Sequence, residues 1–179
     1  TGKAAADILA AMQKAGLNGW EMFVPEGVEE IAPGAFAGMK NLRRVQLPKT
    51  LRRIGAAAFY GCENLTQITL PAGLVELGTA AFKNSGLQEV SVPTRALKLG
   101  CEVFADSALR CAEIKGRQTG EAMFRGCRQL TKLQLNSNTR KIEAGMFRDC
   151  AALKTLRLPE KLEQIGIEAF AGCGALERL

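Results

Sequence analysis

The sequence predicts a repeat solenoid of the α/β class, in which similar turns stack on one another and share one core. Seven of the eight phenylalanines recur in steps of 23, 23, 22, 20, 23 and 23 residues, at Phe36, Phe59, Phe82, Phe104, Phe124, Phe147 and Phe170. An apolar triplet with the spacing L-x-x-L-x-L follows six of them. A period of this length is typical of stacked units, because one unit alone cannot bury its apolar residues.

The second half of each triplet predicts a short strand with one buried face, because apolar and polar residues alternate there. A proline directly follows four of the six triplets, at Pro48, Pro71, Pro93 and Pro159, and would end the strand. Stacked copies would form a parallel sheet. The triplets are Leu42/Val45/Leu47, Leu65/Ile68/Leu70, Leu87/Val90/Val92, Leu109/Ala112/Ile114, Leu130/Leu133/Leu135 and Leu153/Leu156/Leu158.

The segment around each phenylalanine predicts a short helical or irregular turn on the opposite side of the coil from the sheet. In four copies a glycine two residues after the phenylalanine would close this turn, at Gly38, Gly61, Gly126 and Gly172. An aliphatic residue lies five residues before the phenylalanine in six copies, and Thr119 takes that position in the copy of Phe124. We expect these aliphatic residues to belong to the core.

The predicted domains are an N-terminal helical cap over residues 1–19 and a solenoid of about seven units over 20–179, the last one truncated. Residues 4–16 favour a helix with one apolar side, and either a cap or the tail of an upstream segment would explain it. The step from Ile114 to Phe124 is ten residues, against twelve elsewhere, so the segment 115–120 lacks two residues. Neutral drift of a loop and a functional bend would both explain this deletion.

The repeat I-G-x-x-A-F-x-G-C-x-x-L-x-x-I-x-L-P-x-x-L-x-x-I, best seen in 54–76, resembles the BspA-like class of leucine-rich repeats. The resemblance covers about residues 20–179. It implies a curved, right-handed coil with a concave parallel sheet. Members of the class are often cell-surface proteins that mediate adhesion and protein binding, but the class does not define one activity.

The residues that carry most enzyme chemistry are missing or scattered. The chain has no histidine, which excludes the Ser-His-Asp and Cys-His arrangements. A lysine- or carboxylate-based site would still fit the composition, but neither paired acids nor a phosphate-binding glycine loop indicates one. The sequence therefore predicts a protein that is not an enzyme and that needs neither cofactor nor metal.

Four of the six cysteines share one repeat position, three residues after the phenylalanine, where Met39 also occurs. Cys62, Cys127, Cys150 and Cys173 are therefore predicted to be buried core thiols. Cys101 and Cys111 lie at other positions, where both a local disulfide and two exposed thiols fit the sequence. Unpaired core thiols favour an intracellular protein and the resemblance favours the cell surface, so the compartment stays open.

Polar residues between the strand aliphatics would face outward on the concave sheet and form a partner-binding face. They are Arg44, Gln46, Gln67, Thr69, Glu89, Ser91, Glu113, Lys132, Gln134, Thr155 and Arg157. A second candidate surface is a basic patch of Arg43, Arg44, Lys49, Arg52 and Arg53.

The function predicted first is a scaffold or a structural subunit of a larger assembly that binds a protein partner through the concave sheet or an edge of the solenoid. A cell-surface adhesin is the first alternative. Binding of nucleic acid or anionic membrane through the basic patch is the second, since the net charge is +6. Nucleic acid is disfavoured because no aromatic residues interleave the patch. No segment approaches the length of a membrane span.

Overall fold

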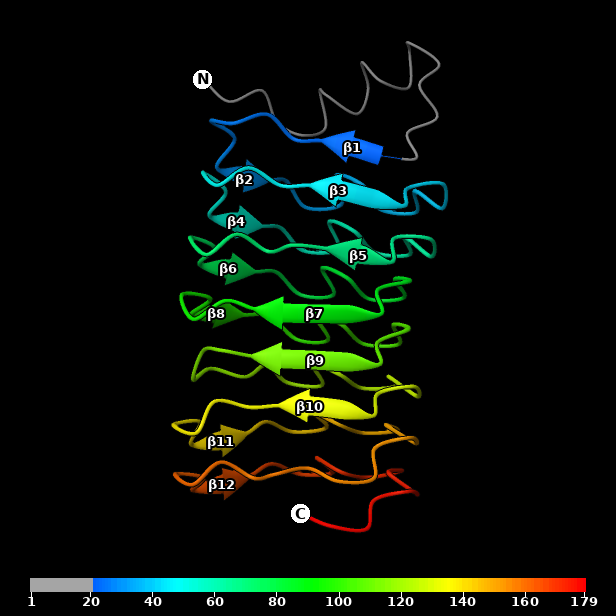
Figure 1. Ribbon diagram of the computed structural model, residues 1–179, viewed down its shortest axis with the longest axis vertical. Helices are drawn as coiled ribbons and strands as arrows, with labels where there is room; N and C mark the ends of the chain where they lie inside the picture. The colour runs from blue at the N-terminus through cyan, green and yellow to red at the C-terminus, as the bar shows by residue number, and fades with distance from the viewer. Residues whose placement is uncertain (1–20) are drawn as a thin grey trace.

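The computed structural model describes residues 21–179 as a stack of coils, most of which have a strand at the front, an edge turn, a strand at the back and a phenylalanine turn (Figure 1). We number the coils 1 to 7 by their phenylalanines, from Phe36 to Phe170. The front row contains β1 (Glu21–Phe23), β3 (Arg44–Gln46), β5 (Gln67–Ile68), β7 (Glu89–Val92), β9 (Cys111–Ile114) and β10 (Lys132–Gln134). The back row contains β2 (Glu30–Ile31), β4 (Arg53–Ile54), β6 (Glu76–Leu77), β8 (Lys98–Leu99), β11 (Lys141–Ile142) and β12 (Gln164–Ile165).

The front row confirms the predicted parallel strands. They form two three-stranded parallel sheets, β1-β3-β5 and β7-β9-β10. Aliphatic residues of successive coils are in register, as in Val90, Ala112 and Leu133. Between the two sheets, the Gln88 amide donates to the Thr66 carbonyl at 3.2 Å, so the stack continues from β5 to β7. In coil 7 a single parallel bridge, Thr155 to Arg178, takes the place of a front strand.

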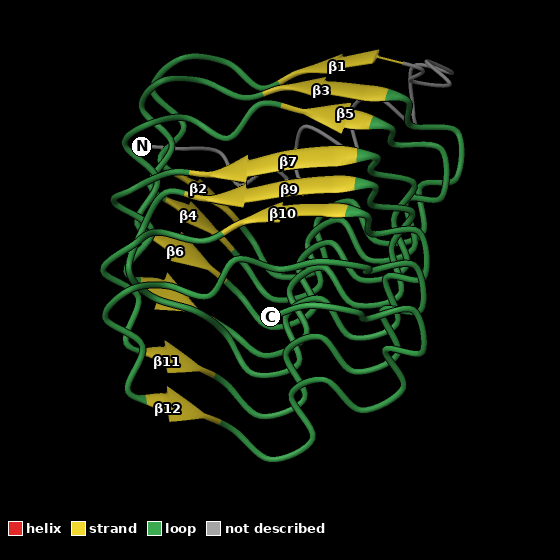
Figure 2. Ribbon diagram, turned by 60° about the horizontal axis from the view of Figure 1, so that its bottom comes forward, coloured by secondary structure: helices red, strands yellow, loops and turns green. Residues whose placement is uncertain are grey.

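The back row of strands was not predicted. It consists of the parallel sheets β2-β4-β6-β8 and β11-β12, on another side of the coil from the front row (Figure 2). Its inward residues are the aliphatics found five residues before each phenylalanine, and Ile31, Ile54 and Leu77 are fully buried. The outward residues Glu30, Arg53, Glu76 and Lys98 alternate in charge from strand to strand. Such opposite pairs stabilise neighbouring strands modestly.

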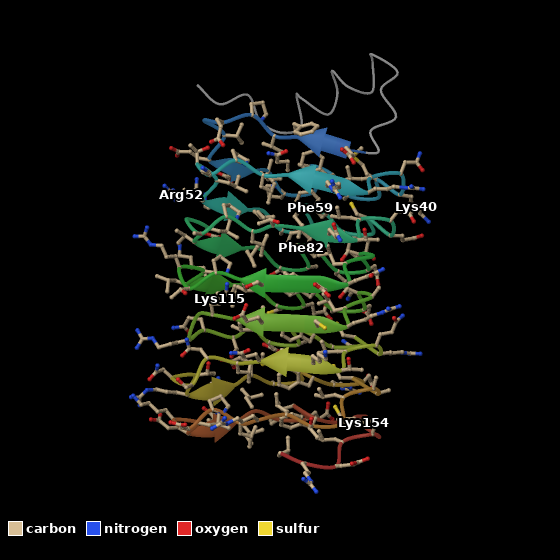
Figure 3. The ribbon with its side chains drawn as sticks, in the orientation of Figure 1. Lys40, Arg52, Phe59, Phe82, Lys115 and Lys154 are labelled. Atoms are coloured by element: carbon tan, nitrogen blue, oxygen red, sulfur yellow. The ribbon has the colours of Figure 1, made fainter. Side chains whose placement is uncertain are left out.

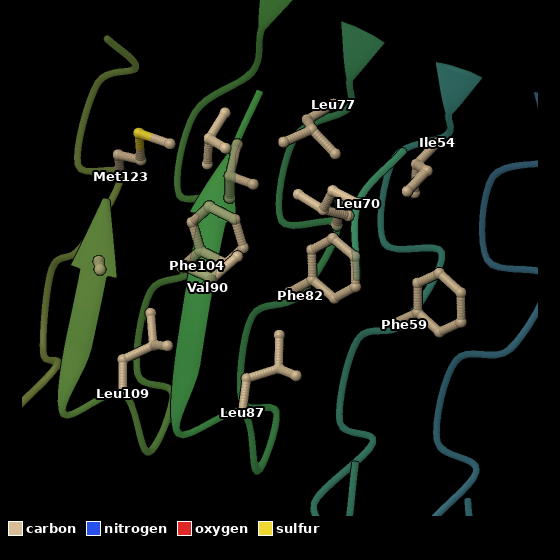
Figure 4. Close-up of a cluster of buried hydrophobic side chains, with 14 of the residues drawn as sticks. Ile54, Phe59, Leu70, Leu77, Phe82, Leu87, Val90, Phe104, Leu109 and Met123 are labelled. Atoms are coloured by element: carbon tan, nitrogen blue, oxygen red, sulfur yellow. The ribbon is translucent and has the colours of Figure 1, made fainter. Parts of the chain in front are cut away.

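The core is a column of phenylalanine rings that runs through all seven coils. Successive ring centroids are 5.0 to 6.0 Å apart and neighbouring planes lie within 24° of parallel. Figure 4 shows Phe59, Phe82 and Phe104 one behind another, between Leu87 and Leu109 on one side and Ile54, Leu77 and Met123 on the other. The rings of coils 1 to 6 are buried. Each coil therefore covers the apolar face of the next, as the repeat predicted.

The turns were predicted to be helical or irregular, and only the helical alternative is wrong: between residues 21 and 179 no helix occurs and the turns are irregular. The reason lies in the backbone on both sides of each phenylalanine. In all seven coils the residue two positions before the phenylalanine has a positive φ, and the residue two positions after it has a positive φ as well. Two left-handed residues within five positions prevent a helix. The closing glycines Gly38, Gly61, Gly126 and Gly172 adopt the expected left-handed conformation, and Asn84, Asp106 and Asp149 replace them in the other coils.

The predicted N-terminal cap, residues 1–19, lies outside the described residues. The handedness and curvature implied by the resemblance stay predictions. Within residues 21–179 there is no helix that is long and apolar enough to cross a membrane.

Candidate functional site

The front row presents a polar outer surface formed by the predicted binding-face residues. Each of these eleven residues is exposed or half-buried, because it alternates along its strand with an aliphatic residue of the core. The front face as a whole therefore offers polar groups held by a rigid framework.

A groove of about 760 Å³ lies across the front face at coils 3 to 7. It gathers seven of the eleven predicted residues: Glu89, Ser91, Glu113, Lys132, Gln134, Thr155 and Arg157. The other four, Arg44, Gln46, Gln67 and Thr69, lie nearer the N-terminal end and do not line it. The sequence did not predict that Ile68, Val90, Ala112 and Leu133 also reach the groove lining. They had been expected only in the core.

The groove has an acidic and a basic part. Glu89 on β7 and Glu113 on β9 provide the acidic groups, while Lys132 on β10 and Arg157 in coil 7 provide the basic groups. The Ser91 hydroxyl donates to Glu113 Oε2 at 2.9 Å, and Lys115 Nζ lies 3.5 Å from the same oxygen. Within the described part of the chain, no ion pair is present for Glu89 or Lys132. These two charges are therefore available to a ligand.

The predicted basic patch is divided between two sheets. Arg44 lies on β3 in the front row and Arg53 on β4 in the back row. Figure 3 shows Arg52 at one edge of the stack, on the same side as Lys115, and Lys40 at the other edge. The five residues therefore do not form one continuous cationic surface.

Carboxylates of coil 1 lie beside several cations of the patch. Arg53 Nη2 donates to Glu30 Oε2 at 2.7 Å, and this hydrogen bond raises the pKa of the Arg53 guanidinium. Arg44 Nη1 lies 4.0 Å from Glu21 Oε1, and the Lys49 amide donates to Glu26 Oε1 at 3.3 Å. Local acids thus offset the positive charge on which a nucleic-acid or membrane site would depend.

The cysteines of the shared repeat position form a ladder of thiols. Each thiol donates to the carbonyl of the phenylalanine one coil earlier, at 3.0 to 3.2 Å: Cys62 to Phe36, Cys127 to Phe104, Cys150 to Phe124 and Cys173 to Phe147. Cys62, Cys127 and Cys150 are buried and Cys173 is half-buried. Cys101 is exposed, Cys111 is half-buried on the front face, and all six are free thiols. The expectation of thiols in the core is therefore confirmed for three of the four.

We expect the two classes of thiol to differ sharply in reactivity. Burial raises the pKa of Cys62 and Cys127 to about 11 and also raises the pKa of Cys150. With 5,5′-dithiobis(2-nitrobenzoate) at pH 8, Cys101 should react promptly and these three only after unfolding in urea. Release of thionitrobenzoate measures this difference. Prompt reaction of Cys62 in the folded chain would contradict the ladder.

The raised pKa values also predict how stability depends on pH. An unfolded cysteine ionises near pH 8.5, while folded Cys62 and Cys127 stay protonated to about 11. Their contribution to stability is therefore complete below about pH 8.5 and is lost as the pH rises toward 11. The urea midpoint should fall over this range, and it should fall less in Cys62→Ala.

The described residues do not offer an obvious catalytic centre. The whole sequence lacks histidine. Between residues 21 and 179, no three Cys, Asp or Glu side chains are grouped so that they could hold a metal ion. The front face instead presents hydrogen-bonding and charged side chains that line a groove.

The stacked parallel strands and the column of core residues define the chain as a leucine-rich-repeat solenoid. The family model for the BspA type leucine rich repeat region (6 copies) matches residues 16–120 and 117–179, so the chain belongs to this family. The fold agrees with the crystal structure of a leucine-rich-repeat protein from T. pallidum, with 31% identity and a TM-score of 0.81 over 89% of this chain and 79% of that one.

A leucine-rich-repeat protein from Bacteroides ovatus ATCC 8483 is similar as well, with 27% identity and a TM-score of 0.71. The match covers 82% of this chain but only 39% of that protein. A third structure, from Eubacterium ventriosum ATCC 27560, shares the fold at 19% identity, with a TM-score of 0.61 over 86% of this chain and 43% of that one. A search of curated proteins found no match.

Proposed function

We propose that this chain is a non-catalytic protein-binding module, a scaffold or assembly subunit, whose front face holds a protein partner. The observation that carries this proposal is the groove of about 760 Å³ across coils 3 to 7, with acidic groups on one part and basic groups on the next. The parallel sheets hold these groups at fixed spacing, so little conformational entropy is lost when a partner binds. Leucine-rich repeats are typically protein-interaction or surface proteins, which supports the proposal.

The groove favours a partner that carries both charges. Glu89 and Glu113 would meet cations of the partner, while Lys132 and Arg157 would meet its anions. The groove contains no aromatic residue, so its specificity would come from charge and hydrogen bonds rather than from an aromatic anchor. Adhesion to a protein at a cell surface would use the same face and is a special case of this function.

Charge reversal in the groove tests the proposal. The wild-type chain and the variants Lys132→Glu and Arg128→Glu are each used to capture partners from an extract of the source cells, followed by quantitative mass spectrometry. Both variants make the same change in net charge, but Arg128 is exposed outside the groove, in a separate hollow that the turn glycine Gly126 also lines. We expect Lys132→Glu to lose the specific partner, with an affinity reduced about tenfold, and Arg128→Glu to retain it.

A partner that both variants capture as well as the wild-type chain does would reject the front face. Equal loss from both variants would indicate attraction by net charge instead of a defined site.

A further inference from the structure

The groove on the front face does not end at the edge of the sheet. A second hollow of about 730 Å³ shares Glu113, Gln134 and Arg157 with it. A third of about 400 Å³ shares Thr94, Lys115 and Asn136 with the second, and a fourth of about 330 Å³ shares Arg117, Gln118 and Asn138 with the third. Together they form one path that follows coil 5 from β9, around the edge, to the back row.

The back part of this path exists because coil 5 is short. The back row has no strand between β8 and β11, so its ladder is interrupted there. No backbone–backbone hydrogen bond is formed by the amides of 116–120, although in coils 2, 3, 4 and 7 amides at the corresponding positions bond to the coil before. We call this interrupted region, lined by Leu97, Lys115, Arg117, Gln118, Thr119, Asn136, Asn138, Arg140, Lys141 and Glu143, the notch.

Coil 6 has a bulky residue at a back-row position where the neighbouring full-length coils have glycine, and this agrees with the recess in coil 5. The residue after the back strand is glycine at Gly78 and Gly100, where an added Cβ would lie 2.4 and 2.3 Å from the backbone of the coil before. In coil 6 the same position is Glu143, whose side chain lines the notch. The recessed coil 5 leaves room for a side chain that full-length coils exclude. The ring spacing is also widest on both sides of Phe124, at 5.7 and 6.0 Å.

The notch is cationic. Its lining contains Lys115, Arg117, Arg140 and Lys141 but only one acid, Glu143. Lys141 pairs with Glu143 at 2.6 Å, Arg140 with Glu163 and Lys115 with Glu113. Arg117 is exposed, and within residues 21–179 no carboxylate pairs with it. A guanidinium beside unbonded backbone amides is suited to a carboxylate.

We propose that the path along coil 5 binds an extended protein segment that carries carboxylate side chains at the end lying over Arg117. The occupant is chosen by charge, since Arg117 has no carboxylate partner among the described residues, and by shape, since the path follows one coil. The contour from Cys111 to Thr119 corresponds to about eight extended residues at about 3.3 Å each. Main-chain groups of the segment would bond to the unbonded amides of 117–119, which belong to exposed or half-buried residues, as when a peptide adds to a sheet edge. The front half of this path rests on the function proposed above, whereas the notch does not.

Peptide binding tests the notch directly. A fluorescein-labelled octapeptide of four serines followed by alternating glutamate and serine, with its carboxylates at one end, is titrated with the full chain, and fluorescence anisotropy gives the affinity. We expect binding that weakens about tenfold in Arg117→Glu, that weakens less in Arg117→Gln, and that is unchanged in Arg128→Glu. A control octapeptide in which lysine replaces each glutamate should not bind. Amide chemical shifts of 116–120 should move on addition of the acidic peptide.

Equal weakening by Arg117→Glu and Arg128→Glu, or no weakening by either, would overturn the proposal. Loss of the captured partner in Lys132→Glu, together with peptide binding that ignores Arg117, would retain the front face and reject the notch. Peptide binding that depends on Arg117, with partner capture unaffected by Lys132→Glu, would retain the notch and reject the front face.

Discussion

The variant Phe82→Ala is expected to lower the free energy of unfolding by about 4 kcal/mol. Phe82 is fully buried, and its ring stacks between Phe59 at 5.1 Å and Phe104 at 5.5 Å, with interplanar angles of 2° and 11°. Truncation removes apolar contact with two neighbouring coils and leaves a cavity that their backbones hold open. Urea denaturation followed by far-UV circular dichroism measures the change.

The matched control is Phe23→Ala, because the Phe23 side chain is 66% exposed on the outer face of β1. Its loss should change the unfolding free energy by less than about 0.5 kcal/mol. Phe82→Leu should fall between the two, since it restores much of the volume but not the stacking. If Phe82→Ala and Phe23→Ala had the same midpoint, the ring column would not be the core that unites the coils.

The front strands and the ring column could be predicted because they repeat with both a period and a chemical type. Val90 and Val92, for example, alternate with polar residues over enough positions to indicate a strand. The same alternation identified Glu89 and Ser91 as outward residues. What it could not give is the groove, because its depth depends on how the backbones of several coils lie relative to one another.

The back strands escaped prediction because they are two residues long. A pair such as Arg53 and Ile54 has no alternation to read, and the aliphatic member looks like one more core position. A signal was present in the charges instead: Glu30, Arg53, Glu76 and Lys98 precede the aliphatic residue in successive units with alternating sign. Stacking in register converts this order into ion pairs, such as Arg53 with Glu30 at 2.7 Å.

A helical turn was one of the two expectations because helices also commonly end at a glycine that follows apolar residues. The other left-handed residue, two positions before the phenylalanine, could not be recognised from the sequence in five coils, because alanine and glutamate do not indicate this conformation. These residues are Ala57, Ala80, Glu102, Ala122 and Glu168. Neighbouring coils hold these residues in a conformation that their side chains disfavour. The Ala80 amide, for instance, donates to the Cys101 carbonyl at 2.9 Å. Contacts between coils therefore override local preference here.

Glycine follows four of the six back strands, at Gly55, Gly78, Gly100 and Gly166, and the close packing of neighbouring coils at this position explains why the motif reads I-G. An added Cβ at Gly78 would lie 2.4 Å from the Ala56 nitrogen and 2.6 Å from the Gly55 carbonyl carbon. Real Cβ atoms do not approach backbone this closely, and backbone in a stacked coil cannot rotate away as a side chain can. Because Gly55 and Gly100 occupy the same position in the coils on either side, any shift would pass through the sheet.

Gly78→Ala should therefore lower the free energy of unfolding by about 3 kcal/mol, the upper range for overpacking. The Gly78–Leu77 region should also lose hydrogen-exchange protection, since the bond from the Gly78 amide to the Ile54 carbonyl, 2.8 Å long, must lengthen. Gly174→Ala is the matched control, because no atom lies within 4 Å of an added Cβ there. Glu143→Ala should also be tolerated, since coil 5 already leaves room for a Cβ at that position. If the Gly78→Ala chain were as stable as the Gly174→Ala chain, the coils would not pack closely at this position. Glu143 would then be no evidence that coil 5 is recessed.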